Sequence, residues 1–185
     1  MSYDLTYKII TGGDASVGKT TMLKRYVEGQ FVDTQMTIGV DIMQKILTLE
    51  DGLNVSLQLW DFGGQQHFRF FLDSFVKGAN GAFLMFDLTN MNSFNNLEEW
   101  VKIIRKDNPT LPIVLIGSKL DLKELIVIDD EMVEDAKERF NFADYLKISS
   151  KTGYNVNKSF IFLVDEIRKY VASLRKTDIS IINNS

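Results

Sequence analysis

The residues of this chain best suited to chemistry begin with the segment GDASVGKT at positions 13–20, which has the form GxxxxGK[ST]. Small residues allow successive backbone N–H groups to point inward at phosphate oxygens, and a following helix adds the positive end of its dipole. We expect Lys19 to reach the β- and γ-phosphates of a nucleotide and the Thr20 hydroxyl to ligate Mg²⁺. A predicted strand at 5–12 and a predicted helix at 18–28 favour this interpretation over a chance glycine-rich turn.

A second segment, SKLD at 118–121, could select the base of the same nucleotide. The Asp121 carboxylate can accept hydrogen bonds from the ring N–H and the exocyclic amine of guanine, whereas adenine presents a ring acceptor that the carboxylate would repel. The Lys119 stem can lie over the base. Alone, four residues are a weak signal, and a solvated loop is the alternative. Their place after an apolar strand, downstream of a phosphate loop, favours the base-binding interpretation.

Composition limits the class of protein. The chain has 185 residues, 45% of them hydrophobic and 25% charged, which is typical of one soluble globular domain. Its net charge of −4 argues against nucleic acid as a partner. The absence of cysteine excludes disulfides, thiolate metal sites and a direct lipid anchor on cysteine. Without a signal peptide or a membrane span, we expect a cytoplasmic monomer that reaches any membrane peripherally, through a partner.

Elements that would position these loops follow from the apolar pattern. Strands are predicted at 5–12, 39–49, 53–60, 82–87, 113–117 and 145–148, the second and third joined by an Asp51-Gly52 hairpin. In the third strand, Val55, Leu57 and Leu59 alternate with Asn54, Ser56 and Gln58, which predicts one solvent-exposed face. The segment 30–37 and the sequence DFGGQ at 61–65 read as loops.

Further helices are predicted at 129–140 and 156–174, and one more begins at an Asn92 or Ser93 cap. The expected inner face of that capped helix is Phe94, Leu97, Val101 and Ile104. The inner face expected for the last helix is Phe160, Leu163, Ile167, Tyr170 and Leu174. Alternating strands and helices predict an α/β domain over 1–174 with a flexible tail at 175–185. Gly13, Asp61, Asp87 and Ser118 lie at strand ends, so their loops should share one edge of the sheet.

Taken together, these segments make the chain resemble the Ras-superfamily small GTPases, most closely their Rab branch, over roughly residues 5–174. Thr37 in MTIGVD resembles the switch I threonine, WDFGGQ the family's WDTAGQ, GSKLD its GNKxD, and Ser149-Ser150-Lys151 its SAK; SFNNLEEW is also Rab-like. The resemblance implies a Rossmann-like P-loop GTPase fold. Its sheet would have six mostly parallel strands, one strand antiparallel, and helices on both faces.

The resemblance also implies roles. Thr20 and Thr37 would ligate Mg²⁺ directly and Asp61 through water, while Gln65 would orient the attacking water. Gly64 would contact the γ-phosphate, Phe31 the base, and Ser150 the guanine oxygen. The expected catalytic residues are Lys19, Thr37 and Gln65. The expected GTP- or GDP-binding residues are Asp14, Ala15, Ser16, Val17, Gly18, Lys19, Thr20, Thr21, Phe31, Thr37, Gly64, Ser118, Lys119, Asp121, Ser149, Ser150 and Lys151.

Several positions depart from the family pattern. Ser118 replaces asparagine and offers one fewer donor, so we expect weaker nucleotide affinity with specificity retained. Gly63 replaces alanine, which predicts a looser hinge. The segment from Phe31 to Thr37 is shorter than in typical Rab proteins, and the Ala15 methyl would crowd an incoming arginine finger.

The predicted activity is that of a guanine-nucleotide-binding switch that slowly hydrolyses GTP. Effector and regulatory proteins would read segments 31–40 and 64–76. Phe68, Phe70, Phe71 and Phe75 are divided between core packing and a docking patch, and His67 is interpreted as a solvent-facing switch residue rather than a catalytic base. One alternative is a module that binds GTP or GDP with little or no hydrolysis. Another is a different P-loop enzyme, such as a kinase, which would need an arginine-rich lid that the sequence does not display.

Overall fold

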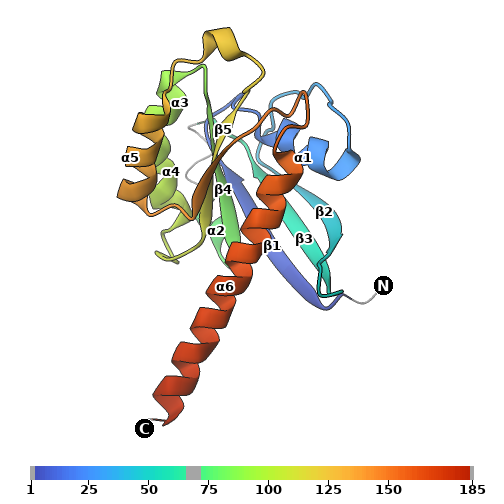
Figure 1. Ribbon diagram of the computed structural model, residues 1–185, viewed down its shortest axis with the longest axis vertical. Helices are drawn as coiled ribbons and strands as arrows, with labels where there is room; N and C mark the ends of the chain where they lie inside the picture. The colour runs from blue at the N-terminus through green and yellow to red at the C-terminus, as the bar shows by residue number, and fades with distance from the viewer. Residues whose placement is uncertain (1–2, 66–71, 184–185) are drawn as a thin grey trace.

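A computed structural model describes residues 3–65 and 72–183 and contains one six-stranded sheet with helices on both faces (Figure 1). The strands are β1 (Leu5–Gly12), β2 (Val40–Thr48), β3 (Asn54–Phe62), β4 (Gly81–Asp87), β5 (Ile113–Ser118) and β6 (Asp144–Lys147). Their order is β2-β3-β1-β4-β5-β6, and β2 pairs antiparallel with β3 while the other pairings are parallel. The predicted fold class is confirmed.

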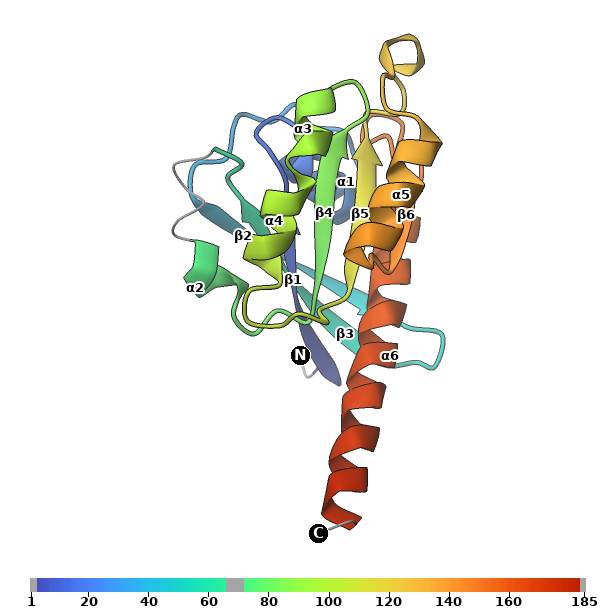
Figure 2. The same cartoon turned by 90° about the vertical axis from the view of Figure 1, so that its left-hand side faces the viewer.

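Helices pack on each face of the sheet. They are α1 (Lys19–Glu28), α2 (Leu72–Val76), α3 (Met91–Asn95), α4 (Leu97–Ile104), α5 (Asp130–Phe140) and α6 (Val156–Asn183), with a 3₁₀ turn η2 (Lys123–Leu125). Helices α1 and α6 pack on one face, where the rings of Tyr26 and Phe160 stack 3.6 Å apart. Helices α2, α4 and α5 pack on the other face, and Figure 2 shows α4 and α5 in front of the sheet, on either side of β4.

The predicted common edge is present. Thr11, at the end of β1, pairs with Asp61 in β3, and Asp87 at the end of β4 pairs with Ser118 at the end of β5. Because parallel strands end together, the loops that follow them gather at this edge, where open α/β sheets bind their ligands. The segment 30–39 has no helix or strand, and several of its residues line the same cavity as the loops at this edge.

Local details correct several expectations. The helix expected to start at Asn92 or Ser93 is capped by Asn90, whose side chain accepts a hydrogen bond from the Asn92 N–H. Asp61 and Phe62 belong to β3 rather than to a loop. Ser56 is buried, not solvent-exposed, and the amide of Gln44 on the neighbouring strand β2 donates to its hydroxyl, so that its burial leaves the hydroxyl paired.

Two predicted inner faces differ in part from the structure. The first omitted Trp100, which is fully buried with Leu97 and Ile104 at regular helical spacing, while Phe94 and Val101 are partly buried against the same core. Leu174 is 46% exposed, because this part of α6 lies beyond the sheet, as Figures 1 and 2 show. Helix α6 also continues past the predicted boundary at 174, to Asn183; the flexible tail at 175–185 stays a prediction. Across residues 3–65 and 72–183, no helix is both long and apolar enough to span a membrane.

Candidate nucleotide site

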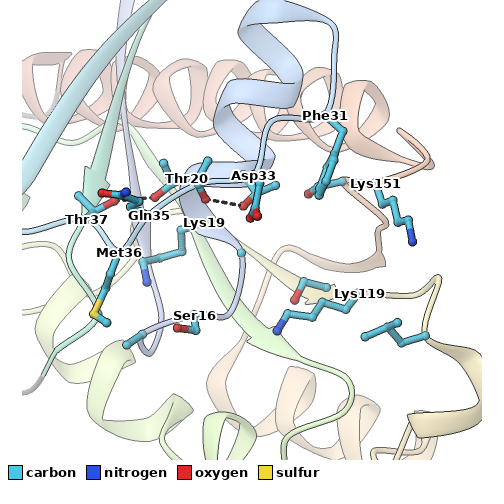
Figure 3. A pocket seen from close by; sticks show the side chains of 18 of the residues that line it. Ser16, Lys19, Thr20, Phe31, Asp33, Gln35, Met36, Thr37, Lys119 and Lys151 are labelled. Carbon is cyan, nitrogen blue, oxygen red and sulfur yellow. Dashed lines mark hydrogen bonds between the residues drawn. The ribbon is translucent and has the colours of Figure 1, made fainter.

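The loops at the carboxyl edge of the sheet enclose a cavity of about 310 Å³ (Figure 3). A volume of this size suits a small-molecule ligand. Lys19, Thr20 and Thr37 lie toward one end of the cavity, and Phe31, Lys119 and Lys151 lie toward the other. Most of the predicted nucleotide-binding residues line it: Ala15, Ser16, Gly18, Lys19, Thr20, Thr21, Phe31, Thr37, Gly64, Ser118, Lys119, Asp121, Ser150 and Lys151.

The phosphate loop holds its lysine through backbone carbonyls. Lys19 is only 6% exposed, and its ammonium donates to the backbone oxygens of Gly13 at 2.8 Å and Asp14 at 2.7 Å. Gly18 caps α1 in a left-handed conformation and offers no side chain to its first turn. Gly18, Lys19, Thr20 and Thr21 line the cavity, so the start of α1 faces it without a side-chain cap, which is the arrangement that binds phosphate.

Three oxygen-bearing side chains from three segments of the chain meet beside Lys19. The hydroxyls of Thr20 and Thr37 lie 2.6 Å apart, and both donate to the Asp61 carboxylate, at 2.5 and 3.0 Å. Asp61 is fully buried, and its other oxygen has no hydrogen-bond partner among residues 3–65 and 72–183. Burial raises the pKa of Asp61, although the Thr20 hydrogen bond and the Lys19 charge act against that rise.

This donor set fits Mg²⁺, which prefers oxygen ligands and retains several waters. The described residues contain no group of three or more His, Cys, Asp or Glu that could hold a metal. A cation here would therefore depend on two hydroxyls, one carboxylate and the oxygens of a bound nucleotide.

The base end of the cavity is built around Asp121. The Ser149 hydroxyl donates to one Asp121 oxygen at 2.6 Å, and the Leu120 N–H donates to the Ile148 oxygen at 3.0 Å. These bonds join the SKLD and SSK loops and fix the carboxylate. The Lys119 ammonium pairs with buried Asp87 at 2.7 Å, which holds the lysine stem along the cavity wall.

Ser118 connects the base loop to the phosphate loop. Its hydroxyl lies 2.6 Å from the Val17 oxygen and 3.0 Å from the Phe86 oxygen. A hydroxyl carries one proton, so it can donate fully to only one of these two carbonyls at a time. The expected hydrogen bond between position 118 and the phosphate loop is therefore present, but the serine supplies only one donor for it.

The cavity does not include every predicted residue. Asp14, Val17, Asp61, Gln65 and Ser149 lie outside its lining. Asp61 and Ser149 act on residues that do line it, and Asp14 contributes a backbone oxygen to Lys19. Gln65 is partly buried, and its side-chain oxygen has no partner within the described ranges.

Some lining residues were not predicted. These are Asp33, Thr34, Gln35, Met36, Phe62 and Leu122. The first four lie between Phe31 and Thr37, so a continuous loop joining those two predicted residues could have indicated them. The Thr34 hydroxyl lies 2.9 Å from that of Thr21, which ties this loop to α1.

The glycines of DFGGQ are required for close approach. A Cβ on Gly63 would lie 2.8 Å from the backbone oxygen of Thr37, and one on Gly64 would lie 2.3 Å from the backbone nitrogen of Ala15. Gly63 thus makes room for Thr37, a steric reason beyond the looser hinge that was expected. His67, Phe68, Phe70 and Phe71 lie outside the described residues, and Phe75 is partly buried against Trp60.

Comparison with known proteins agrees with this geometry. The family model described as "Ras family" matches residues 8–169. The Ras-related protein RABD1 of Arabidopsis thaliana is 37% identical over 92% of this chain and 83% of its own length. The GTP-binding protein YPTM1 of Zea mays is 36% identical over 90% and 80%, and the Ras-related protein Rab-1D of Dictyostelium discoideum 34% identical over 95% and 86%.

A P-loop sheet with a nucleotide-sized cavity at its carboxyl edge defines a nucleotide-binding α/β protein. The chain belongs to the Ras family, as a guanine-nucleotide-binding small GTPase of the Rab branch.

Proposed function

We propose that this small GTPase hydrolyses GTP slowly to GDP and phosphate, in a Mg²⁺-dependent reaction, and that two loops signal which nucleotide is bound. The observation that carries the proposal is the meeting of Thr20, Thr37 and Asp61. It joins the phosphate loop, the switch I segment and the DFGGQ segment beside the phosphate end of the cavity. A change in the ligand beside these three side chains would therefore affect the phosphate loop, the switch I segment and the DFGGQ segment together.

The chain's own residues have separable tasks in this reaction. Lys19 and the N–H groups at the start of α1 would neutralise the β- and γ-phosphate oxygens. Thr20, Thr37 and Asp61 would hold Mg²⁺, which supplies further neutralisation of charge on the phosphates. Gln65 would orient the water that attacks the γ-phosphorus, and Asp121 would keep the guanine base in place.

Loss of the γ-phosphate would release Thr37 and Gly64, so the segments that contain them would relax. In segment 31–40, Met36 is 58% and Ile38 is 78% exposed, on either side of Thr37. Effector and regulatory proteins that contact segments 31–40 and 64–76 would then distinguish the two nucleotide states. Any association with a membrane would run through such partners.

One observation favours a second candidate, a module that binds GTP or GDP without hydrolysis. Gln65 does not line the cavity, so its side chain must move before it can orient a water there. The hydrolysing enzyme and the binding-only module therefore differ in whether the Gln65 side chain turns toward the phosphates.

A single-turnover measurement tests the proposal. Purified protein is loaded with GTP, Mg²⁺ is added, and bound nucleotide is separated by chromatography over several hours. We expect conversion to GDP at a rate on the order of 10⁻⁴ per second, typical of an unassisted small GTPase, and arrest by EDTA. Persistent bound GTP would support the binding-only candidate, and equal conversion of ATP would contradict guanine selectivity.

A further inference from the structure

The side chain of Asp14 has a role that the phosphate-loop motif does not assign. One of its carboxylate oxygens accepts a hydrogen bond from the Asn96 amide at 2.6 Å, and the other accepts one from the Trp100 indole N–H at 2.8 Å. The donors lie 82 and 86 positions along the chain, beyond β4 in the sequence. The carboxylate is therefore directed to the junction of α3 and α4, not into the cavity.

The backbone of the same residue contacts the catalytic end of the cavity. The Asp14 carbonyl oxygen accepts a hydrogen bond from Lys19 at 2.7 Å. A Cβ on Gly64 would lie 2.3 Å from the Asp14 carbonyl carbon, so the DFGGQ segment rests directly on this peptide. A shift of Asp14 would move the anchor of Lys19 and the surface that supports Gly64 together.

The two donors are themselves firmly held. Trp100 is fully buried, and a Cβ on Gly12 would lie 3.1 Å from its ring, so the indole packs against the end of β1. Asn96 is the residue between α3 and α4, and its backbone oxygen accepts a hydrogen bond from the backbone N–H of Trp100 at 3.3 Å. Rigid donors aimed at both oxygens of one carboxylate restrict its position strongly.

We infer that Asp14 is a positioning residue, which ties the phosphate loop to the α3–α4 junction and so keeps Lys19 aligned with the β- and γ-phosphates. This inference rests on the binding of guanine nucleotide and not on its hydrolysis. Asn96 and Trp100 thereby become determinants of nucleotide retention, although neither lines the cavity.

Exchange of donor and acceptor provides the test. Asp14→Ala removes the acceptor, and Asn96→Asp places two carboxylates against each other. The double variant Asp14→Asn/Asn96→Asp restores one donor and one acceptor with the direction reversed, while the amide oxygen that it introduces at position 14 can still accept from Trp100. Glu98→Gln on α4 is the matched control, because Glu98 pairs with Lys102 and Arg139 and not with the phosphate loop.

Release of a fluorescent GDP analogue is measured in each variant. We expect release to accelerate about tenfold or more in Asp14→Ala and Asn96→Asp, and to return to within about threefold of wild type in the double variant. Glu98→Gln should match wild type. Affinity for GMP, which has no β-phosphate for Lys19, should change less than about twofold in the two single variants.

Other results would overturn the inference. GDP release in Asp14→Ala equal to wild type would remove the positioning role, and so would a double variant no slower than Asn96→Asp. Equal loss of GDP and GMP affinity would indicate general loss of structure instead of phosphate alignment. Failure of the wild-type protein to bind GDP would contradict nucleotide binding itself, which separates that result from the others.

Discussion

The side-chain hydroxyl of Thr37 lies 2.6 Å from that of Thr20, although the two residues are 17 positions apart in the chain. Both hydroxyls donate to one fully buried carboxylate, that of Asp61. The segment before Thr37 brings this hydroxyl to the phosphate end of the cavity. The loop at 30–39 is thus linked to the phosphate loop through three side chains.

Thr37→Ala should slow GTP hydrolysis about tenfold or more while leaving GDP affinity within about threefold of wild type. The variant loses a hydroxyl at the proposed metal site, but it retains Lys19, the base loop and the helix α1 N-terminus. Single-turnover hydrolysis and GDP titration measure the two effects. Thr37→Ser is the control, since it keeps the hydroxyl; loss of activity in that variant as well would assign the effect to the methyl group.

Gln65→Leu should retain nucleotide binding and lose most hydrolysis, by about two orders of magnitude. Leucine is similar in size to glutamine but cannot orient a water molecule. The measurement is again conversion of bound GTP, with GDP affinity determined in parallel. An unchanged hydrolysis rate would remove Gln65 from the mechanism, in agreement with its place outside the cavity lining.

Asp121→Asn should shift the preference from guanosine toward xanthosine nucleotides, because one acceptor facing the base becomes a donor. Ser149 can keep its hydrogen bond to the remaining side-chain oxygen, so the loop geometry should survive. Competition between GDP and xanthosine diphosphate measures the change. A variant that keeps its preference for GDP would contradict the assignment of Asp121 to the base.

Ser118→Asn should slow GDP release about threefold to tenfold. The serine hydroxyl has one proton for the Val17 and Phe86 oxygens, whereas the asparagine amide has two N–H donors. Release of a fluorescent GDP analogue is the measurement, and the thermal midpoint of the variant is the check that the larger side chain is accommodated. Faster release from a folded variant would show that the single hydroxyl is the better brace.

Asp61→Asn should raise the thermal midpoint of the nucleotide-free protein and abolish the effect of Mg²⁺ on GDP release. Burial raises the pKa of Asp61, so this carboxyl lowers stability as pH rises above its unfolded-state pKa, and the loss is complete once pH exceeds its pKa in the folded protein. The amide removes this charge, and the Thr20 and Thr37 hydroxyls can accept as well as donate. Melting in EDTA at neutral pH measures the first effect; a lower midpoint would show that the charge is well compensated.

Sequence patterns were sufficient for the sheet and for the edge that carries the site. Apolar strands, the Asp51-Gly52 hairpin and the ordered motifs each have a local physical cause, so their positions could be read from the chain. The burial of Trp100 was missed although it lies three residues after Leu97 and four before Ile104, because the neighbouring Val101 fits the same apolar helical pattern. The exposure of Leu174 depends on where α6 leaves the sheet, which is a tertiary property.

The direction in which side chains of the motifs point was the other feature that the sequence could not predict. GxxxxGK[ST] identifies Asp14 as part of the phosphate loop, but its carboxylate is directed by Asn96 and Trp100, which lie 82 and 86 positions away. Gly63 is a second example. The sequence suggested only that a residue without a Cβ would be flexible, whereas in the structure the backbone oxygen of Thr37 occupies the space that a Cβ would need. Both facts arise from contacts between loops that the sequence places far apart.

Calorimetric titration of the nucleotide-free protein with GDP and then with ADP tests the central claim most directly, since it asks whether one cavity binds phosphate at Lys19 and guanine at Asp121. We predict tight binding of GDP and an affinity for ADP weaker by about a thousandfold or more. Equal affinity for the two nucleotides, or no heat of binding from either, would contradict it.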